Sequence, residues 1–326
     1  MKPDFRYEKS RTEKGLICES YQLIDLDGNT FDQENNPIVI MPTGLAVKPG
    51  DIDNGDYVAK SILPNKVTNP FFKGNYLGDF PSHLAARHGL DVRVLYQPAV
   101  SGNGHKRGMY SEETKQLMFE EFLTLAEGRP IYLVSHSLST DLHTDILMGV
   151  DYTKKDRGQF LPGALSGIMT TGKDSLTDRK GKSRKIVGIP WYWVFKTAEV
   201  TLPSFPCALP IYPLTAQELH DGLDLKKKNV NWAADRWINP ATARDVMKID
   251  NIKKTESYCG QAPLSIITTE DAIFDPKLQE EVARNLGAIS SNISVGHRWF
   301  TGKGRKGVAS DIAEHLKWSK PLESRL

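Results

Sequence analysis

Apolar residues recur along this chain in two patterns that alternate with each other. Short, mostly apolar runs, typical of strands buried on both faces, occur at 37–41, 91–96, 131–134 and 262–269, and further strands are predicted at 162–171 and 289–295. Apolar residues at helical spacing occur at 76–88, 111–125, 141–148, 276–286 and 307–316. Strands and helices that alternate in this way predict an α/β fold with a mostly parallel, doubly wound sheet.

The N-terminal part of the chain departs from this pattern. Apolar residues roughly alternate over 16–25, and the turn signal Asp27-Gly28-Asn29 separates them from Thr30-Phe31, which together predict an entry hairpin. Residues 47–69 are rich in Gly, Pro, Asn and Asp and have no clear period, so they predict a long loop.

The alternation is also interrupted between residues 172 and 257. This segment carries four of the six tryptophans in the chain, Trp191, Trp193, Trp232 and Trp237. At 326 residues the chain is long for one ordinary domain and short for two. We therefore predict a core formed by 1–171 and 258–326, with 172–257 inserted as a cap or lid.

Composition narrows the classes of partner and compartment. A net charge of +2 with 25% charged residues disfavours nucleic acid or an anionic membrane as a partner, and the basic runs at 178–185 and 226–228 are interpreted as solvated loops. The charged N-terminus lacks the apolar core of a signal peptide, and no run approaches the ~20 apolar residues of a membrane span. A cytoplasmic protein without a membrane span is expected. The oligomeric state stays unknown.

Cysteine usage bears on cofactors. Cys18, Cys207 and Cys259 are too few and too scattered for a disulfide framework or a zinc site. We interpret them as free thiols, and we expect no metal.

One of the predicted strands leads directly into a serine-centred turn. The pentad Ser135-His136-Ser137-Leu138-Ser139 follows the run at 131–134 and precedes a predicted helix. So sharp a turn leaves room only for small flanking residues, and its usual form is G-x-S-x-G. Serine replaces both glycines here, at a cost in backbone strain. A serine-rich turn that only caps the helix fits the same residues, because serine is a favoured N-cap.

Four candidates follow predicted strands, where ligands bind in open parallel sheets: residues 43–45, Ser137, Asp271 and His297. A serine hydroxyl needs an imidazole to accept its proton, and the imidazole needs a carboxylate to orient it. Ser137, His297 and Asp271 supply these groups. Asp275 is a rival acid that also fits a helix N-cap, and a surface histidine without a role is the alternative for His297. His136 and His105 are interpreted as supporting or structural residues.

The chain order serine, acid, histidine is that of the α/β-hydrolase triad. Over about residues 35–317 the sequence resembles the α/β-hydrolase superfamily, most closely its cap-bearing lysophospholipase, monoacylglycerol-lipase and serine-aminopeptidase-like branch. The matching segments are 42–45, 135–139, 269–274 and 295–297. Thr43 stands where that branch usually has the His of a His-Gly pair. The resemblance implies that the amides of Leu138 and Leu45 form the oxyanion hole and that no cofactor is needed.

This resemblance implies a serine hydrolase that cleaves a carboxylic ester through an acyl-enzyme on Ser137. The apolar content of the predicted cap favours a small-molecule substrate with an acyl or aromatic group. A thioesterase, a lactonase or an acyltransferase would use the same triad, so these activities stay open. A non-catalytic α/β-hydrolase-fold protein that only binds a ligand is the alternative from another class.

Overall fold

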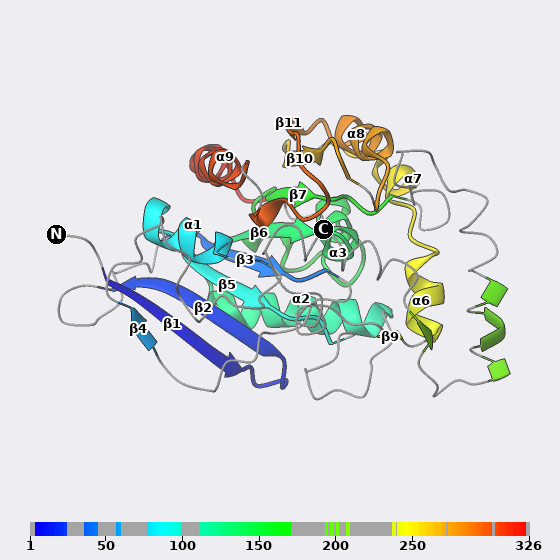
Figure 1. Cartoon of the computed structure of the whole chain (residues 1–326), viewed down its shortest axis with the longest axis horizontal. Helices are drawn as coiled ribbons and strands as arrows, with labels where there is room; N and C mark the ends of the chain where they lie inside the picture. Colours follow the sequence, from blue (N-terminus) through cyan, green and yellow to red (C-terminus); the bar gives the residue numbers. More distant parts are fainter. Residues whose placement is uncertain are drawn as a thin grey trace.

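A nine-stranded sheet runs through the described part of the computed structural model (Figure 1). The structure describes residues 4–24, 36–44, 57–59, 77, 79–98, 111–170, 193–194, 196–198, 200–201, 207–208, 237–238, 240–271, 273–301 and 304–323. The strand order is β11-β10-β7-β6-β3-β5-β2-β1-β4. The bounds are β1 (Asp4–Arg11), β2 (Ile17–Ile24), β3 (Ile38–Pro42), β4 (Tyr57–Ala59), β5 (Asp91–Leu95), β6 (Ile131–His136), β7 (Ala164–Ser166), β10 (Leu264–Thr268) and β11 (Ile289–Ile293).

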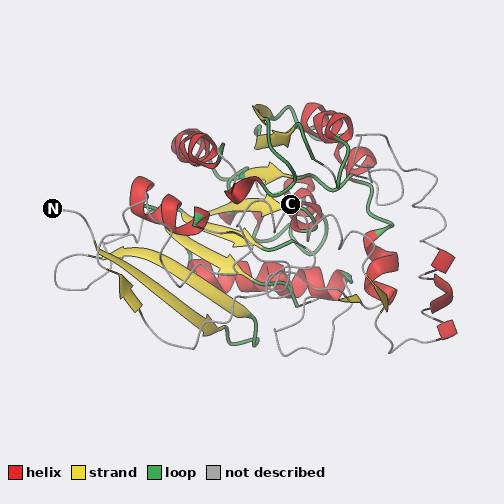
Figure 2. Ribbon diagram, in the orientation of Figure 1, coloured by secondary structure: helices red, strands yellow, loops and turns green. Residues whose placement is uncertain are grey.

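Helices cover both faces of this sheet (Figure 2). The bounds are α1 (Phe80–His88), α2 (Glu112–Ala126), α3 (Ser139–Met148), α6 (Pro240–Val246), α7 (Asn251–Thr255), α8 (Pro276–Asn285) and α9 (Arg305–Trp318). One apolar core joins α1 and α9 to the sheet through buried residues such as Leu84 and Ile312. A second core joins α2, α3 and α8 to the other face through Phe122, Ile146 and Val282. The two cores make a doubly wound architecture.

The sheet is mostly parallel, as predicted. The pairs from β5 through β3, β6, β7 and β10 to β11 are all parallel, whereas β2 is antiparallel to β5 and to β1. Every residue of β3, β6 and β10 is buried, as expected for strands with helices on both faces. The predicted α/β fold class is therefore confirmed.

The N-terminal hairpin differs from the one predicted. β2 pairs with β1, which precedes it, whereas Thr30-Phe31 lies outside the described residues. β1 escaped prediction because its aromatic residues, Phe5 and Tyr7, alternate with the charged Arg6 and Glu8 in a strand that is otherwise polar. The short strand β4 pairs with β1 inside the segment predicted to be a loop, so that prediction was wrong for these three residues.

The division into a core and a cap stays a prediction. Within 172–257, the described residues include α6, α7 and the paired strands β8 (Cys207–Ala208) and β9 (Trp237–Ile238). α7 packs against α3 and α8, and the Asn251 side-chain amide donates to the carbonyl of Met169 at 2.6 Å. The C-terminal end of the predicted insertion is thus joined directly to helices of the core.

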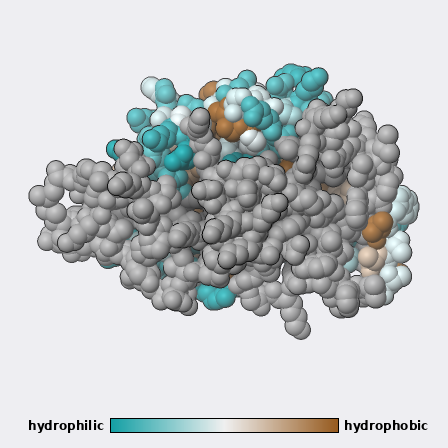
Figure 3. Space-filling view, viewed as in Figure 1, coloured by the Kyte–Doolittle hydropathy of each residue, from teal (hydrophilic) through white to brown (hydrophobic). Residues whose placement is uncertain are grey.

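The surface visible in Figure 3 is mainly hydrophilic where residues are described, with small apolar patches. Ile289 and Trp318 are among the exposed large apolar residues, at 57% and 77%. No described helix combines the length and the apolar character needed to cross a membrane.

A largely buried ion-pair network ties three helices together. Lys254 of α7 and Lys115 of α2 both contact Asp141 and Asp145 of α3, with Lys254 Nζ 2.6 Å and Lys115 Nζ 2.8 Å from the Asp145 carboxylate. The side chains of Asp141 and Asp145 are only 1% and 6% exposed. Burial raises the pKa of Asp141, but the charges of Lys254 and Lys115 outweigh burial and hold that pKa below its usual value.

We predict that Lys254→Met destabilises the fold, because the two buried carboxylates lose one of their two counter-charges. The free energy of unfolding, measured by urea denaturation, should fall by about 3 kcal/mol. Lys248→Met is the matched control, since Lys248 is half exposed and, among the described residues, forms an ion pair with Asp245 alone, at 3.2 Å. That variant should cost less than about 0.5 kcal/mol. Equal losses in the two variants would show that the network does not stabilise the fold.

Candidate active site

Ser137 occupies a strained turn between β6 and α3. Its φ angle is +58°, in the left-handed region. Among the described residues other than glycine, Ser137 and Glu127 have positive φ, and Glu127 ends α2, where that conformation is common. The left-handed conformation costs an L-residue about 1–2 kcal/mol. The pentad therefore forms the sharp strand–turn–helix connection that the sequence predicted.

Hydrogen bonds on both sides of Ser137 hold this turn. The Ser137 amide donates to the carbonyl of Ser166 at 3.1 Å. The carbonyl of Ser137 accepts from the amide of Thr140 at 3.0 Å and from its hydroxyl at 2.6 Å. The same hydroxyl oxygen accepts from the amide of Met169 at 3.1 Å. The backbone of Ser137 is therefore fixed by neighbours from α3 and from the segment around β7.

The two serines that replace the usual glycines behave differently. Ser139 Oγ accepts from the amide of His136 at 2.8 Å and donates to the carbonyl of His136 at 2.9 Å. Ser135 Oγ is buried and has no hydrogen-bond partner in the described part of the chain. Only Ser139 therefore gives the turn polar contacts that glycine could not supply.

The end of β3 lies directly against the serine. A Cβ added to Gly44 would lie 3.0 Å from Ser137 Cβ and 3.2 Å from the carbonyl oxygen of His136, so this position accepts only glycine without a shift. The preceding residue, Thr43, is tied to Gln97, whose side-chain amide donates to the Thr43 carbonyl at 2.5 Å. Leu45, one of the two predicted oxyanion-hole donors, lies outside the described residues.

Leu138, the other predicted donor, follows the serine immediately. It is buried and stands at the N-cap position of α3. The amide of Leu138 therefore lies at the N-terminal end of a ten-residue helix, where the helix dipole favours negative charge.

Asp271 and His297 form a buried pair. Asp271 Oδ2 lies 2.8 Å from His297 Nδ1, and the two residues are 3% and 2% exposed. The carboxylate also accepts hydrogen bonds from the amides of Ile273 (2.8 Å) and Phe274 (2.9 Å), the hydroxyl of Thr268 (3.0 Å) and the side-chain amide of Gln279 (3.2 Å). Burial raises the pKa of Asp271, but the charge of His297, its hydrogen bond and the amides of Phe274 and Ile273 outweigh burial, so the pKa lies below its usual value.

The rival acid, Asp275, has a different position. Its side chain accepts a hydrogen bond from the amide of Lys277 at 3.0 Å and caps the N-terminus of α8. The structure thus places Asp271 beside His297. Asp275 is the N-cap of α8, the second role that its sequence position suggested.

Ser137, Asp271 and His297 all lie beyond the carboxyl ends of parallel strands of the sheet. They follow β6, β10 and β11, respectively. Gly167 lies close to the imidazoles of His297 and His136. It follows Ser166, whose carbonyl accepts a hydrogen bond from the Ser137 amide. A Cβ at Gly167 would lie 2.7 Å from His297 Cε1 and 2.8 Å from His136 Cε1. The serine turn and the histidine of the buried pair therefore flank the same short segment.

Gln279 and Thr268 support the acid and were missed in the sequence. Gln279 is fully buried on α8, where it shares a face with Val282, Ala283 and Leu286 at helical spacing. A polar residue on an otherwise apolar helix face was a readable signal of a buried hydrogen bond. Thr268 gave no such signal, because threonine is common in strands.

An apolar cluster adjoins the residue after the serine. It combines side chains from the serine turn, the segment after β7, the region of α6 and the loop after β10, all at most 8% exposed: Leu138, Met169, Val246, Ile249, Ile273 and Phe274. In the described part of the chain, no three His, Cys, Asp or Glu side chains gather as ligands for a metal ion.

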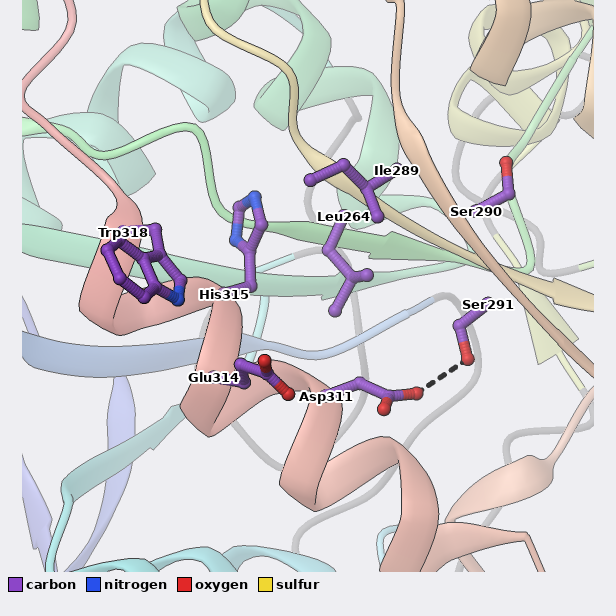
Figure 4. A pocket seen from close by; sticks show the side chains of 8 residues that line it. All are labelled: Leu264, Ile289, Ser290, Ser291, Asp311, Glu314, His315 and Trp318. Carbon is purple, nitrogen blue, oxygen red and sulfur yellow. Dashed lines mark hydrogen bonds between the residues drawn. The ribbon is translucent and has the colours of Figure 1, made fainter.

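A second serine, aspartate and histidine line a pocket elsewhere. This pocket, of about 550 Å³, contains Leu264 and Ile289, the first residues of β10 and β11, so it opens near the amino ends of these strands (Figure 4). Ser291 Oγ donates to Asp311 at 2.7 Å. His315 Nδ1 lies 2.8 Å from the Tyr132 hydroxyl, and its Nε2 lies 3.1 Å from the carbonyl of Ala262. Both imidazole nitrogens are engaged away from Ser291, so this group lacks the geometry of a triad.

We predict that the two flanking serines contribute unequally to stability. Ser139→Ala should lower the free energy of unfolding by about 1–2 kcal/mol, because it removes two hydrogen bonds to the His136 backbone. Ser135→Ala is the matched control and should stay within about 0.5 kcal/mol of the wild type or gain stability, since its hydroxyl is buried without a partner. Urea denaturation measures both. A larger loss for Ser135→Ala than for Ser139→Ala would contradict this account of the turn.

No protein-family model and no curated protein matches the chain. Solved structures do match it. A soluble variant of monoglyceride lipase from Saccharomyces cerevisiae, in complex with a substrate analogue, matches with a TM-score of 0.59 and 13% identity over 97% of this chain and 96% of that one. The α/β hydrolase GrgF from Penicillium sp. sh18 matches with a TM-score of 0.59 and 11% identity over 96% and 98%.

The monoacylglycerol lipase of Paleococcus ferrophilus is also similar, with a TM-score of 0.53 and 14% identity over 86% of this chain and 95% of that one. Identities this low bear on the fold and not on the activity. Together with the strand order and the two helical layers, they confirm the predicted architecture: the chain has the α/β-hydrolase fold.

Proposed function

We propose that this protein is a serine hydrolase that cleaves carboxylic esters through an acyl-enzyme on Ser137. The observation that carries the proposal is the strained, positive-φ serine turn beside a buried Asp271–His297 pair. Backbone strain of this kind concentrates at functional sites. A carboxylate hydrogen-bonded to a histidine is the arrangement that orients a general base toward a nucleophile.

In the proposed reaction, Ser137 Oγ attacks the acyl carbon while His297 accepts the hydroxyl proton. Asp271 stabilises the imidazolium that forms. The amides of Leu138 and Leu45 stabilise the oxyanion, and the position of Leu138 at the N-terminus of α3 supports its part in this role. His297 then protonates the leaving alcohol, and water repeats the cycle on the acyl-enzyme.

An acyl or aromatic group is the substrate feature best supported. The apolar cluster around Leu138, Ile273 and Phe274 adjoins the nucleophile and favours an apolar substrate. The fold shared with the yeast monoglyceride lipase makes the lipase-like, cap-bearing branch the first one to test. We further propose that residues 172–257 form the cap that completes the acyl pocket. Rates on p-nitrophenyl esters of rising chain length would define the preferred acyl group.

The alternatives differ in substrate or in turnover. Thioesterase, lactonase and acyltransferase activities would use the same three residues, and a panel of thioesters, lactones and acceptor alcohols separates them from ester hydrolysis. A ligand-binding protein without turnover is favoured only by the loss of the two glycines of the elbow. Ser139 weakens that case, because it makes two hydrogen bonds that glycine could not.

We predict that Ser137→Ala abolishes both ester hydrolysis and labelling by a fluorophosphonate probe, because it removes the attacking oxygen. Turnover should fall by roughly a million-fold, as for other triad serines. Ser291→Ala, at the serine of the second pocket, should keep wild-type labelling. Retention of labelling by Ser137→Ala would assign the nucleophile to another residue, and an unlabelled wild-type protein would favour the ligand-binding alternative.

A second prediction separates the two acids. Asp271→Asn should lower kcat by about ten thousand-fold, because His297 loses the carboxylate that orients it. Asp275→Asn should keep nearly full activity, since asparagine is an equally good N-cap for α8. Steady-state kinetics on p-nitrophenyl acetate test both variants. A reversed ranking would move the acid to Asp275.

A further inference from the structure

A second imidazole lies against the proposed general base. The rings of His136 and His297 have centroids 4.4 Å apart and planes inclined by 44°. Phe274 closes another side of His297, with centroids 5.1 Å apart and a near-perpendicular angle of 69°. Asp271 binds the Nδ1 end of the same ring at 2.8 Å. His297 therefore lies in a slot whose walls come from the end of β6 and the loop after β10.

His136 itself is fixed. Its backbone is bound on both sides by Ser139 Oγ, at 2.8 and 2.9 Å. Its ring nitrogen Nδ1 lies 3.2 Å from Ser166 Oγ, and Phe300 packs edge-on against the ring with centroids 4.8 Å apart. The residue is only 2% exposed. These contacts hold the ring of His136 in a fixed position against the ring of His297.

Gly167 lies against the rings of both His136 and His297, where a larger residue would clash with them. A Cβ at Gly167 would come within 2.7 Å of His297 Cε1 and within 3.0 Å of both His136 Cε1 and His136 Nδ1. Gly167 also has a φ of +51°, which disfavours other residues. The loop after β7 thus packs against a third side of His297, and it fits there because its residue at 167 has no side chain.

We propose that His136 is a positioning residue, whose ring holds the imidazole of His297 in the orientation required by Asp271 and by the attacking serine. This inference rests on the proposed function, in which His297 is the base. His136 does not replace His297 in that role, because the Asp271 carboxylate binds His297, whereas Nδ1 of His136 lies against the Ser166 hydroxyl.

The charge state of His136 supports this role. Burial, followed by the charges of His297 and Arg298, holds the pKa of His136 well below its usual value, so the wall is neutral. The described charged or titratable groups around the two rings are Asp271, Arg298 and the imidazoles themselves. A neutral wall adds no repulsion when His297 takes up the proton of the serine.

Two substitutions of His136 distinguish the effect of its ring from the effect of its hydrogen bond to Ser166. His136→Ala removes the wall, so kcat on p-nitrophenyl acetate should fall by about tenfold to a hundredfold while KM changes little. His136→Phe keeps a ring of similar shape and should restore most of the lost kcat. His143→Phe is the matched control, because His143 is equally buried but binds the carbonyl of Pro162, and its kcat should stay near the wild-type value.

Nuclear magnetic resonance of the histidine side chains supplies a readout that needs no turnover, so we would apply it in the Ser137→Ala background. His136→Ala should admit water to the slot and raise the pKa of His297 by about half a unit or more. His136→Phe should keep the wild-type titration. This measurement stays decisive even if the ester hydrolase proposal fails.

The outcomes are distinct. An unchanged kcat and an unchanged His297 titration in folded His136→Ala would overturn the inference while leaving the Ser137 prediction intact. Equal losses of kcat in folded His136→Phe and His136→Ala would also overturn it, because the ring alone would not then be sufficient. Should His136→Ala fail to fold, His136→Leu, which removes the ring but fills part of its space, takes its place, and unchanged values of both readouts in that variant would overturn the inference.

Discussion

The left-handed backbone of Ser137 is the constraint on which the rest of the site depends. Strand β6 must turn sharply into helix α3, and the residue at that turn is a serine with a φ of +58° instead of a glycine. The cost of about 1–2 kcal/mol is offset locally, because Ser166 and Thr140 bind the Ser137 amide and carbonyl through three hydrogen bonds. Each such bond contributes about 1 kcal/mol net. The turn therefore keeps its strained form without relying on the substrate.

Helix α3 is fixed along its whole length, so the turn cannot relax by a shift of the helix. Its first and second turns are held by the ion pairs of Asp141 and Asp145 with lysines of α2 and α7. Its C-terminal end is held by Arg157, which is 2% exposed and whose Nε donates to the Ile146 carbonyl at 2.9 Å, at the negative end of the helix dipole. Rigid support of this kind is what places a side chain accurately for chemistry. The same helix carries Ser139, which fixes the backbone of His136.

Much of this arrangement was predictable from the sequence, for a physical reason. Residues that follow parallel strands lie at one edge of the sheet, so the strands predicted at 262–269 and 289–295 placed Asp271 and His297 near each other. β1 was missed because its pattern is mostly polar. The sequence favoured Asp271 over Asp275, because Asp275 stands before Pro276 and fits a helix N-cap. The hydrogen bond between Asp271 and His297 was visible only in the fold. The contact between His136 and His297 was equally out of reach, because it joins residues 161 positions apart.

The absence of the two elbow glycines is the one feature that argues against catalysis, and its weight depends on what the serines do. Ser139 adds two hydrogen bonds that brace the backbone at His136, so its replacement of glycine strengthens the turn. One feature runs against stability, namely a serine kept at positive φ. A protein that only enclosed a ligand would not need it. It is accounted for if the hydroxyl of Ser137 must face an imidazole oriented by Asp271, whose pKa is held below its usual value, and this is why we favour turnover over simple binding.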